Sequence, residues 1–227
     1  MDFDIEVSNL ILFLQKYAHH SVDNLFGTLK ISTNAKSKNY ILSNALCSLY
    51  KGKEIFEAIC EHENIHLKTI QLKENGKPQE AMSFATIDFK EIVKETWETS
   101  TFKKYINGRF LFFLFKKTAF ENFLERIFLW EISDDDLESV KGVWEKTKEL
   151  LQEGRVIRCI DEKGKIITNF PNEAGTLVCH VRPHGRDGVD LNPLPVQDVA
   201  TGYNVMSKQS FWFNHNFLYK IAKEKEQ

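Results

Sequence analysis

The sequence predicts an α+β fold in which a mixed central β-sheet is flanked by helices. Apolar residues recur at helical spacing over about the first 50 residues, and a regular apolar and polar alternation begins at residue 65. Residues 110–115 form an uninterrupted apolar run, which is typical of a central strand buried on both faces. The last third of the chain is rich in short strand-like segments. No internal repeat and no linker rich in Gly, Ser or Pro interrupts the 227 residues. We therefore expect one domain over residues 1–227, with a helical part at 1–52 and a sheet-containing part at 53–227.

Three helices are predicted in the N-terminal part. Residues 5–17 carry leucines and an isoleucine at helical spacing. Ser21 is a residue type favoured at N-caps, so a second helix is expected to start there and to end near Gly27. After a polar stretch at 33–39, residues 40–50 form the third predicted helix.

A hairpin is predicted next. Residues 65–72 alternate between apolar and polar side chains, residues 74–77 read Glu-Asn-Gly-Lys and form a turn, and residues 81–89 are expected to be the returning strand. A short helix at 89–96 follows.

The core strand is predicted at 109–116 and its neighbour at 123–130. Ser133 and the three aspartates after it can satisfy the free N–H groups of a helix start, and they precede an amphipathic helix that runs to about Glu153 and ends at Gly154. The remaining predicted elements are strands at 155–160, 165–168, 176–182 and 208–213, a loop at 183–199 and a closing helix at 217–225.

Net charge limits the function classes that the chain can serve. At −2 the whole chain gives no support for nucleic-acid binding, so any DNA surface must be a local patch.

The acidic N-terminus has no secretory signal, and the run at 110–115 is too short to span a bilayer. We therefore expect a cytoplasmic protein without a membrane partner. The cysteines are expected to be reduced, buried residues, because no pair has close metal-ligand spacing: Cys47, Cys60, Cys159 and Cys179.

The predicted strand at 65–72 carries the most informative pair of residues. Metal-dependent nucleases place an acidic residue and a lysine on one strand with one residue between them, so that both face the same side. The carboxylate holds Mg²⁺, which activates water and stabilises charge on the phosphate. Here Lys68 occupies the lysine position and His66 the acidic position. By itself, this pattern is more often a solvated strand face.

A second pattern is the basic loop CHVRPHGR. Arginine and histidine are donors matched to guanine edges and phosphates, and Pro183 shapes a loop that can enter a groove. Composition alone does not distinguish a loop that contacts DNA from a solvated loop with incidental basic residues. Downstream, Trp212 alternates with Phe211 and Phe213, so either Trp212 or its two neighbours face outward.

Several stretches resemble one known family. LKTIQLKENGKPQEAMSF is similar to the hairpin of the MutH mismatch-repair endonuclease family, and TWETSTFK, RFLFFLF, LLQEGRV, CHVRPHGR and KQSFWFNHNFL follow in the family's order. Together they cover the chain from about residue 37 to the end. The likeness is strongest to the C-terminal module of two-module bacterial restriction endonucleases that cut GATC, and it implies a MutH-like fold. That module keeps the phrases MSF, FLFF, CHVRPH and KQSFW, binds a second DNA copy and regulates the cutting module.

The resemblance also shows which catalytic residues are missing. His66 stands where active members have a glutamate, the position of a metal-binding aspartate falls near Ile59, and Ser48 or a neighbour replaces a carboxylate on the preceding helix. Lys68 survives. Glu61 and Glu63 are close in sequence and offer the one route to a rebuilt metal site.

The resemblance implies a DNA-binding set of residues and a set of partners. By likeness to the family's base-reading loop and last strand, the set is Arg182, Pro183, His184, Arg186, Lys208, Gln209 and Trp212. We expect sequence-selective binding of double-stranded DNA at GATC, without catalysis, metal or cofactor in this chain. The implied partner is the catalytic N-terminal module of the same enzyme, which requires Mg²⁺. Two alternatives stay open, an active Mg²⁺ endonuclease with rearranged carboxylates and a structural or dimerisation module.

Overall fold

The computed structural model describes residues 2–32, 37–156, 158–160, 162, 166–184 and 190–224. The chain divides into two compact units. The first consists of residues 1–80, 105–132 and 219–227, and the second of residues 81–104 and 133–218. The helices of the first 52 residues lie in the same unit as the first sheet. That the whole chain forms one domain stays a prediction.

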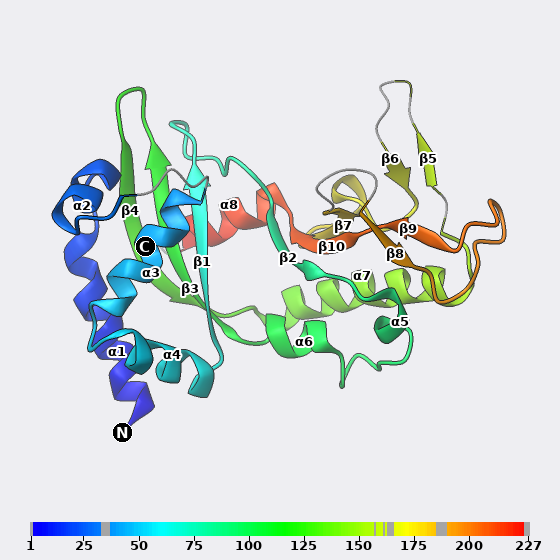
Figure 1. Ribbon diagram of the computed structural model, residues 1–227, viewed down its shortest axis with the longest axis horizontal. Coiled ribbons are helices and arrows are strands. Elements are labelled where there is room, and N and C mark those ends of the chain that lie inside the picture. The colour runs from blue at the N-terminus through cyan, green and yellow to red at the C-terminus, as the bar shows by residue number, and fades with distance from the viewer. Residues whose placement is uncertain are drawn as a thin grey trace. The chain divides into compact units, whose positions relative to one another are not determined.

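A mixed three-stranded sheet forms the centre of the first unit (Figure 1). Its order is β1 (Ile65–Leu72), β3 (Arg109–Lys117) and β4 (Asn122–Trp130), with β1 parallel and β4 antiparallel to β3. Every residue from Phe110 to Phe115 is at most 1% exposed. The prediction of a strand buried on both faces is therefore confirmed, and so is the α+β class with a mixed sheet.

Helices of the N-terminal part cover one face of this sheet. Ser21 caps the second of them, because its hydroxyl accepts a hydrogen bond from the backbone N–H of Asn24, as predicted. Their apolar residues form one core with Leu111, Phe113 and Phe115 of β3. The helices are α1 (Phe3–Leu14), η1 (Gln15–Tyr17), α2 (Val22–Thr28), α3 (Lys38–Ser48) and α4 (Lys53–His62).

The predicted hairpin between β1 and the next strand is wrong. A tight turn does form, since the N–H of Lys73 donates to the carbonyl of Lys77 at 2.8 Å, and Leu72 pairs with Pro78. Beyond it, β2 (Met82–Thr86) joins β10 in another sheet. Alternation identifies a strand and its faces but not its partner. Pro78 has no N–H with which to continue a ladder.

The sheet of the second unit is antiparallel. Its order is β2, β10 (Gln209–Phe213) and β7 (Cys179–Pro183). The helix α7 (Asp134–Gln152) packs near β7. The hydroxyl of Ser133 accepts a hydrogen bond from the N–H of Asp136, and Gly154 follows the helix at a φ of 61°, so both predicted ends of this helix are confirmed.

Short elements complete the fold. The predicted loop at 183–199 contains a three-residue strand, and the predicted strand at 155–160 is shorter than expected, since residues 155 and 156 do not belong to it. The described residues of the predicted strand at 165–168, which are 166–168, form a strand. Segments of this length carry too few residues for a periodic pattern. The elements are α5 (Phe89–Ile92), α6 (Thr101–Ile106), β5 (Arg158–Ile160), β6 (Ile166–Thr168), η2 (Glu173–Gly175), β8 (Leu191–Pro193), β9 (Val205–Ser207) and α8 (His215–Glu224).

None of the cysteine side chains that the structure describes forms a disulfide. Cys47, Cys60 and Cys179 are free thiols, and burial raises the pKa of each of them. The side chain of Cys159 lies outside the described part. No helix among the described residues is both long enough and apolar enough to cross a membrane.

Candidate nucleic-acid interface

The first candidate feature is the face of β1 that carries His66 and Lys68. Strand alternation places the two side chains on the same side of the sheet, as the sequence predicts. The His66 ring stacks on Tyr105 of α6, with centroids 3.8 Å apart and planes 19° from parallel. The Lys68 Nζ lies 5.6 Å from the centre of the same tyrosine ring. The sequence contained no pattern that pointed to Tyr105.

A glycine makes room for the His66 ring. A Cβ at Gly108 would come within 2.7 Å of the Asn64 carbonyl oxygen and 2.8 Å of His66 Nε2. Contacts this short do not occur between real atoms, so the histidine ring fills the space beside a residue that has no side chain. The histidine is thus built into the local packing.

Electrostatics favour a neutral histidine on this face. Burial, followed by the charge of Lys68, lowers the pKa of His66 below its usual range. Burial also lowers the pKa of the Lys68 ammonium. His66 is therefore an uncharged nitrogen donor or acceptor at neutral pH, where an active nuclease has an anion.

The residues at the other expected metal positions do not supply oxygen anions. Ile59 lies on α4 and is fully buried in the core that the N-terminal helices share with β3. The Ser48 hydroxyl donates to the Asn44 carbonyl oxygen at 2.8 Å. Within the described ranges, no three His, Cys, Asp or Glu side chains are grouped so that they could hold a metal ion. Mg²⁺ prefers hard oxygen ligands, so this donor set does not fit it.

Neither nearby glutamate rebuilds the site. Glu63 accepts a hydrogen bond from Arg109 Nη1 at 3.0 Å, and its other oxygen lies 2.8 Å from His62 Nδ1. It precedes β1, while Lys68 lies three residues into the strand, roughly 10 Å beyond the strand's first residue. Glu61 is exposed at the end of α4.

The second candidate feature lies in the second unit, on one face of β7 and β10. The register pairs Ser210 with Arg182 and Trp212 with His180, so these four side chains share a face. The guanidinium carbon of Arg182 lies 3.7 Å from the centre of the Trp212 ring, and the ring of exposed His184 lies 5.0 Å from it. We call Arg182, His184 and Trp212 the β7–β10 surface.

The structure decides which way Trp212 faces. Phe211 and Phe213 are 3% and 0% exposed and pack on Phe102 and Phe84, respectively. They occupy the core face, so Trp212 lies on the opposite, partly exposed face. The Arg182 guanidinium therefore lies over an indole ring in a cation–π contact, which restricts its position.

The other predicted DNA-binding residues are placed differently. Pro183 is exposed and pairs with Gln209, whose own side chain is 0% exposed and donates to the Ser207 carbonyl oxygen at 3.0 Å. The Lys208 ammonium is 2.7 Å from an Asp190 carboxylate oxygen, which offsets part of its charge. Arg186 lies outside the described residues. Among the members of the set that the structure describes, Arg182, His184 and Trp212 come together.

Two buried polar residues lie beside the β7–β10 surface: His180, which belongs to the basic motif but not to the predicted DNA-binding set, and Ser210, which was not singled out from the sequence. His180 is 3% exposed, and its Nδ1 lies 2.7 Å from Asn214 Oδ1. Burial lowers the pKa of His180, so its ring is neutral. The Ser210 hydroxyl is fully buried without a hydrogen-bond partner. Alternation back from Trp212 and Arg182 would have placed both residues on this face.

Comparison with known proteins gives two findings. The family model of the DNA mismatch repair enzyme MutH matches residues 55–142, which include β1, β3 and β4. The chain is also similar to the type II restriction enzyme Sau3AI of Staphylococcus aureus, with 29% identity over an alignment of 245 positions, gaps included. The alignment covers 92% of this chain and 50% of that protein. The chain thus spans about half the length of this relative.

Proposed function

We propose that this chain, which resembles the MutH family over residues 55–142 and the restriction enzyme Sau3AI over 92% of its own length, binds double-stranded DNA selectively at GATC and does not hydrolyse it. In this proposal it is the regulatory module of a type II restriction endonuclease. Its partner is a catalytic N-terminal module that carries the Mg²⁺ site. Binding of one DNA copy here favours cleavage of another there, which is allostery once the coupling between the two sites is measured.

The chemistry of the β1 face carries the first half of the proposal. Hydrolysis by this class of nuclease needs carboxylate oxygens that hold Mg²⁺ beside the lysine. His66 is neutral and packed on Tyr105, and the Glu63 carboxylate is bound to Arg109. The face keeps a phosphate-binding cation, Lys68, without an anionic cage for a metal.

The β7–β10 surface supports the second half. Arginine reads guanine through two parallel N–H groups at the edge of its planar fork. The Trp212 ring lies 3.7 Å from the Arg182 guanidinium carbon and positions this side chain. In the proposed complex the N–H edge of the guanidinium contacts the base. An arginine that is partly desolvated and positioned by an aromatic ring is better prepared for base recognition than an arginine on a solvated loop.

We expect the chain to leave DNA uncut. Incubation with a GATC-containing plasmid and Mg²⁺ or Mn²⁺ should give no nicked or linear product on a gel, because the β1 face has no oxygen cage for the metal. Lys68→Ala is the matched control. Cleavage that persists in Lys68→Ala comes from a contaminant, whereas cleavage that this variant abolishes would establish the rival reading of an active nuclease with rearranged carboxylates.

Binding should weaken as salt rises, despite the net charge of −2. Each neutralised phosphate releases counterions, so three phosphate contacts would cost roughly forty-fold in affinity between 50 and 200 mM salt. Fluorescence anisotropy titrations of a GATC duplex across that range measure the slope. A dissociation constant that stays flat with salt would contradict the proposed basic contacts.

A further inference from the structure

The closed end of the β3–β4 hairpin exposes an aromatic ring. Phe120 is 95% exposed, the highest value among the large apolar side chains of the described residues. It lies in the first unit, and neither the β1 face nor the β7–β10 surface includes it. Water around a whole phenylalanine ring is unfavourable, so an exposed ring at a defined position marks a candidate contact.

The turn holds Phe120 in place. The Thr118 hydroxyl accepts hydrogen bonds from the N–H groups of Phe120 and Glu121, at 3.3 and 3.1 Å, and the Thr118 N–H donates to the Glu121 carbonyl oxygen at 2.8 Å. A turn closed by its own side chain loses little entropy on binding. The ring therefore projects from a preorganised support.

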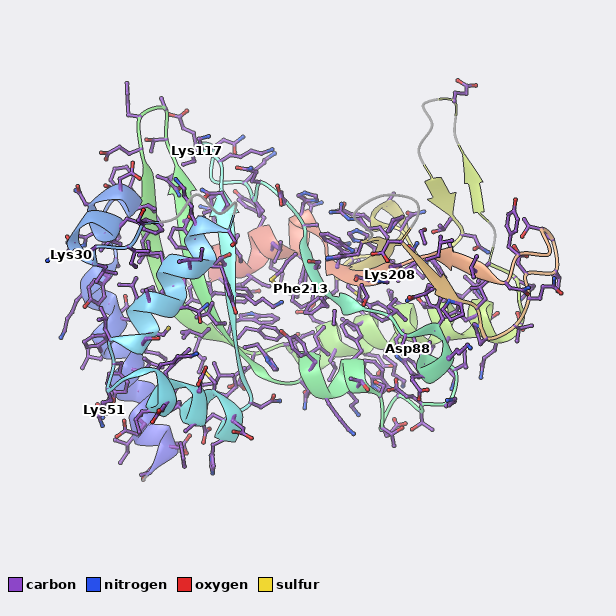
Figure 2. All side chains as sticks on the ribbon, viewed as in Figure 1. Lys30, Lys51, Asp88, Lys117, Lys208 and Phe213 are labelled. Carbon is purple, nitrogen blue, oxygen red and sulfur yellow. The ribbon has the colours of Figure 1, made fainter. Side chains whose placement is uncertain are left out.

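Lysines outnumber carboxylates at this end of the sheet. Lys116 and Lys117 precede it in β3, and Figure 2 shows Lys117 at the closed end of the hairpin. The register pairs Leu72 with Lys116, which brings the turn after β1 to the same end of the sheet. Asn39 bonds to Gln71 and Asn122 and brings the start of α3 there. The described lysines at this end are Lys38, Lys73, Lys77, Lys116 and Lys117, against the glutamates Glu74, Glu121 and Glu125. The Lys116 ammonium lies 3.9 Å from a Glu125 carboxylate oxygen, so Lys117 and the lysines of the neighbouring segments supply most of the excess positive charge.

We propose that this hairpin end, residues 116–122, is a second DNA contact in which the Phe120 ring wedges into a base step from the minor groove. Lysines beside it would bind the flanking phosphates. Apolar side chains inserted between base pairs unstack them and kink the duplex, and cations on the backbone hold the protein there. The inference rests on the proposed duplex binding and adds a sequence-independent contact to it.

Charge favours DNA over other occupants of the hairpin end. A second copy of this chain would bring like charges together at a symmetric contact, because the same lysines would meet. A duplex offers stacked bases to the ring and an anionic backbone to the lysines within one groove. Self-association through Phe120 is an outcome that the test must detect.

The test compares Phe120→Ala and Phe120→Trp with Leu12→Ala, which removes a side chain 71% exposed on α1 of the same unit. Loss of one aromatic stack should weaken a GATC duplex and a scrambled duplex equally, by roughly five- to 150-fold. A 2-aminopurine reporter should brighten with the wild type and with Phe120→Trp but not with Phe120→Ala. Leu12→Ala should behave as wild type, and all melting temperatures should agree.

The outcomes separate this inference from the proposed function. If the wild type binds DNA and Phe120→Ala binds as tightly, without loss of the 2-aminopurine signal, the wedge is overturned and the proposed function stands. If the wild type binds neither duplex, both fall. If Phe120→Ala alters only self-association in analytical ultracentrifugation, the ring is a protein contact and the wedge is overturned.

Discussion

Arg182→Ala is expected to reduce the preference for GATC over a scrambled duplex by roughly five- to 150-fold, because a bidentate arginine–guanine contact contributes about 1–3 kcal/mol of discrimination. Trp212 holds the guanidinium at 3.7 Å, so the contact is preorganised. Competition titrations at fixed salt measure the preference directly. Arg182→Lys is the informative partner variant, because it keeps the charge and loses the planar fork.

Lys68→Ala is the control for this experiment. Any DNA contact of Lys68 is expected to be with phosphate, and phosphate contacts position a protein without reading sequence. The variant should therefore weaken both duplexes by a similar factor. If Arg182→Ala keeps the wild-type preference, or Arg182→Lys keeps it as well as arginine does, the β7–β10 surface is not the reader of sequence.

Periodicity explains why much of the fold was predictable. A period of two identified β1 and placed His66 beside Lys68, and an unbroken apolar run identified β3. Side-chain capping identified the starts of α2 and α7 at Ser21 and Ser133. These features depend on residues that are close together in the sequence, so the sequence alone predicts them.

Features that depend on distant pairing could not be read in this way. The partner of β2 is β10, more than a hundred residues away, and no local pattern specifies that pairing. The stack of Arg182 on Trp212 depends on the register of β7 against β10. The burial of Gln209 and the ion pair of Lys208 with Asp190 likewise follow from which face and which loop lie beside β10.

His66→Glu should make DNA binding depend on divalent cations. Wild type has a neutral ring at this position, so its affinity should be the same in EDTA and in Ca²⁺ at matched ionic strength. Repulsion between a carboxylate and a phosphate about 4 Å apart costs about 1 kcal/mol in bulk water and about 4 kcal/mol near a protein surface. The variant should therefore bind roughly fivefold or more weakly in EDTA, and Ca²⁺ should restore part of the loss by bridging the two anions.

His66→Gln separates charge from shape in this experiment. It removes the ring that stacks on Tyr105 but adds no charge, so it should bind DNA equally with and without Ca²⁺. Thermal melting of both variants shows whether the packing beside Gly108 tolerates the change. A wild-type affinity that rises with Ca²⁺ at constant ionic strength would mean that carboxylates such as Glu61 do gather at Lys68. The β1 face would then be a metal site, because a divalent cation that bridges a protein carboxylate and a DNA phosphate makes the affinity for DNA depend on that cation.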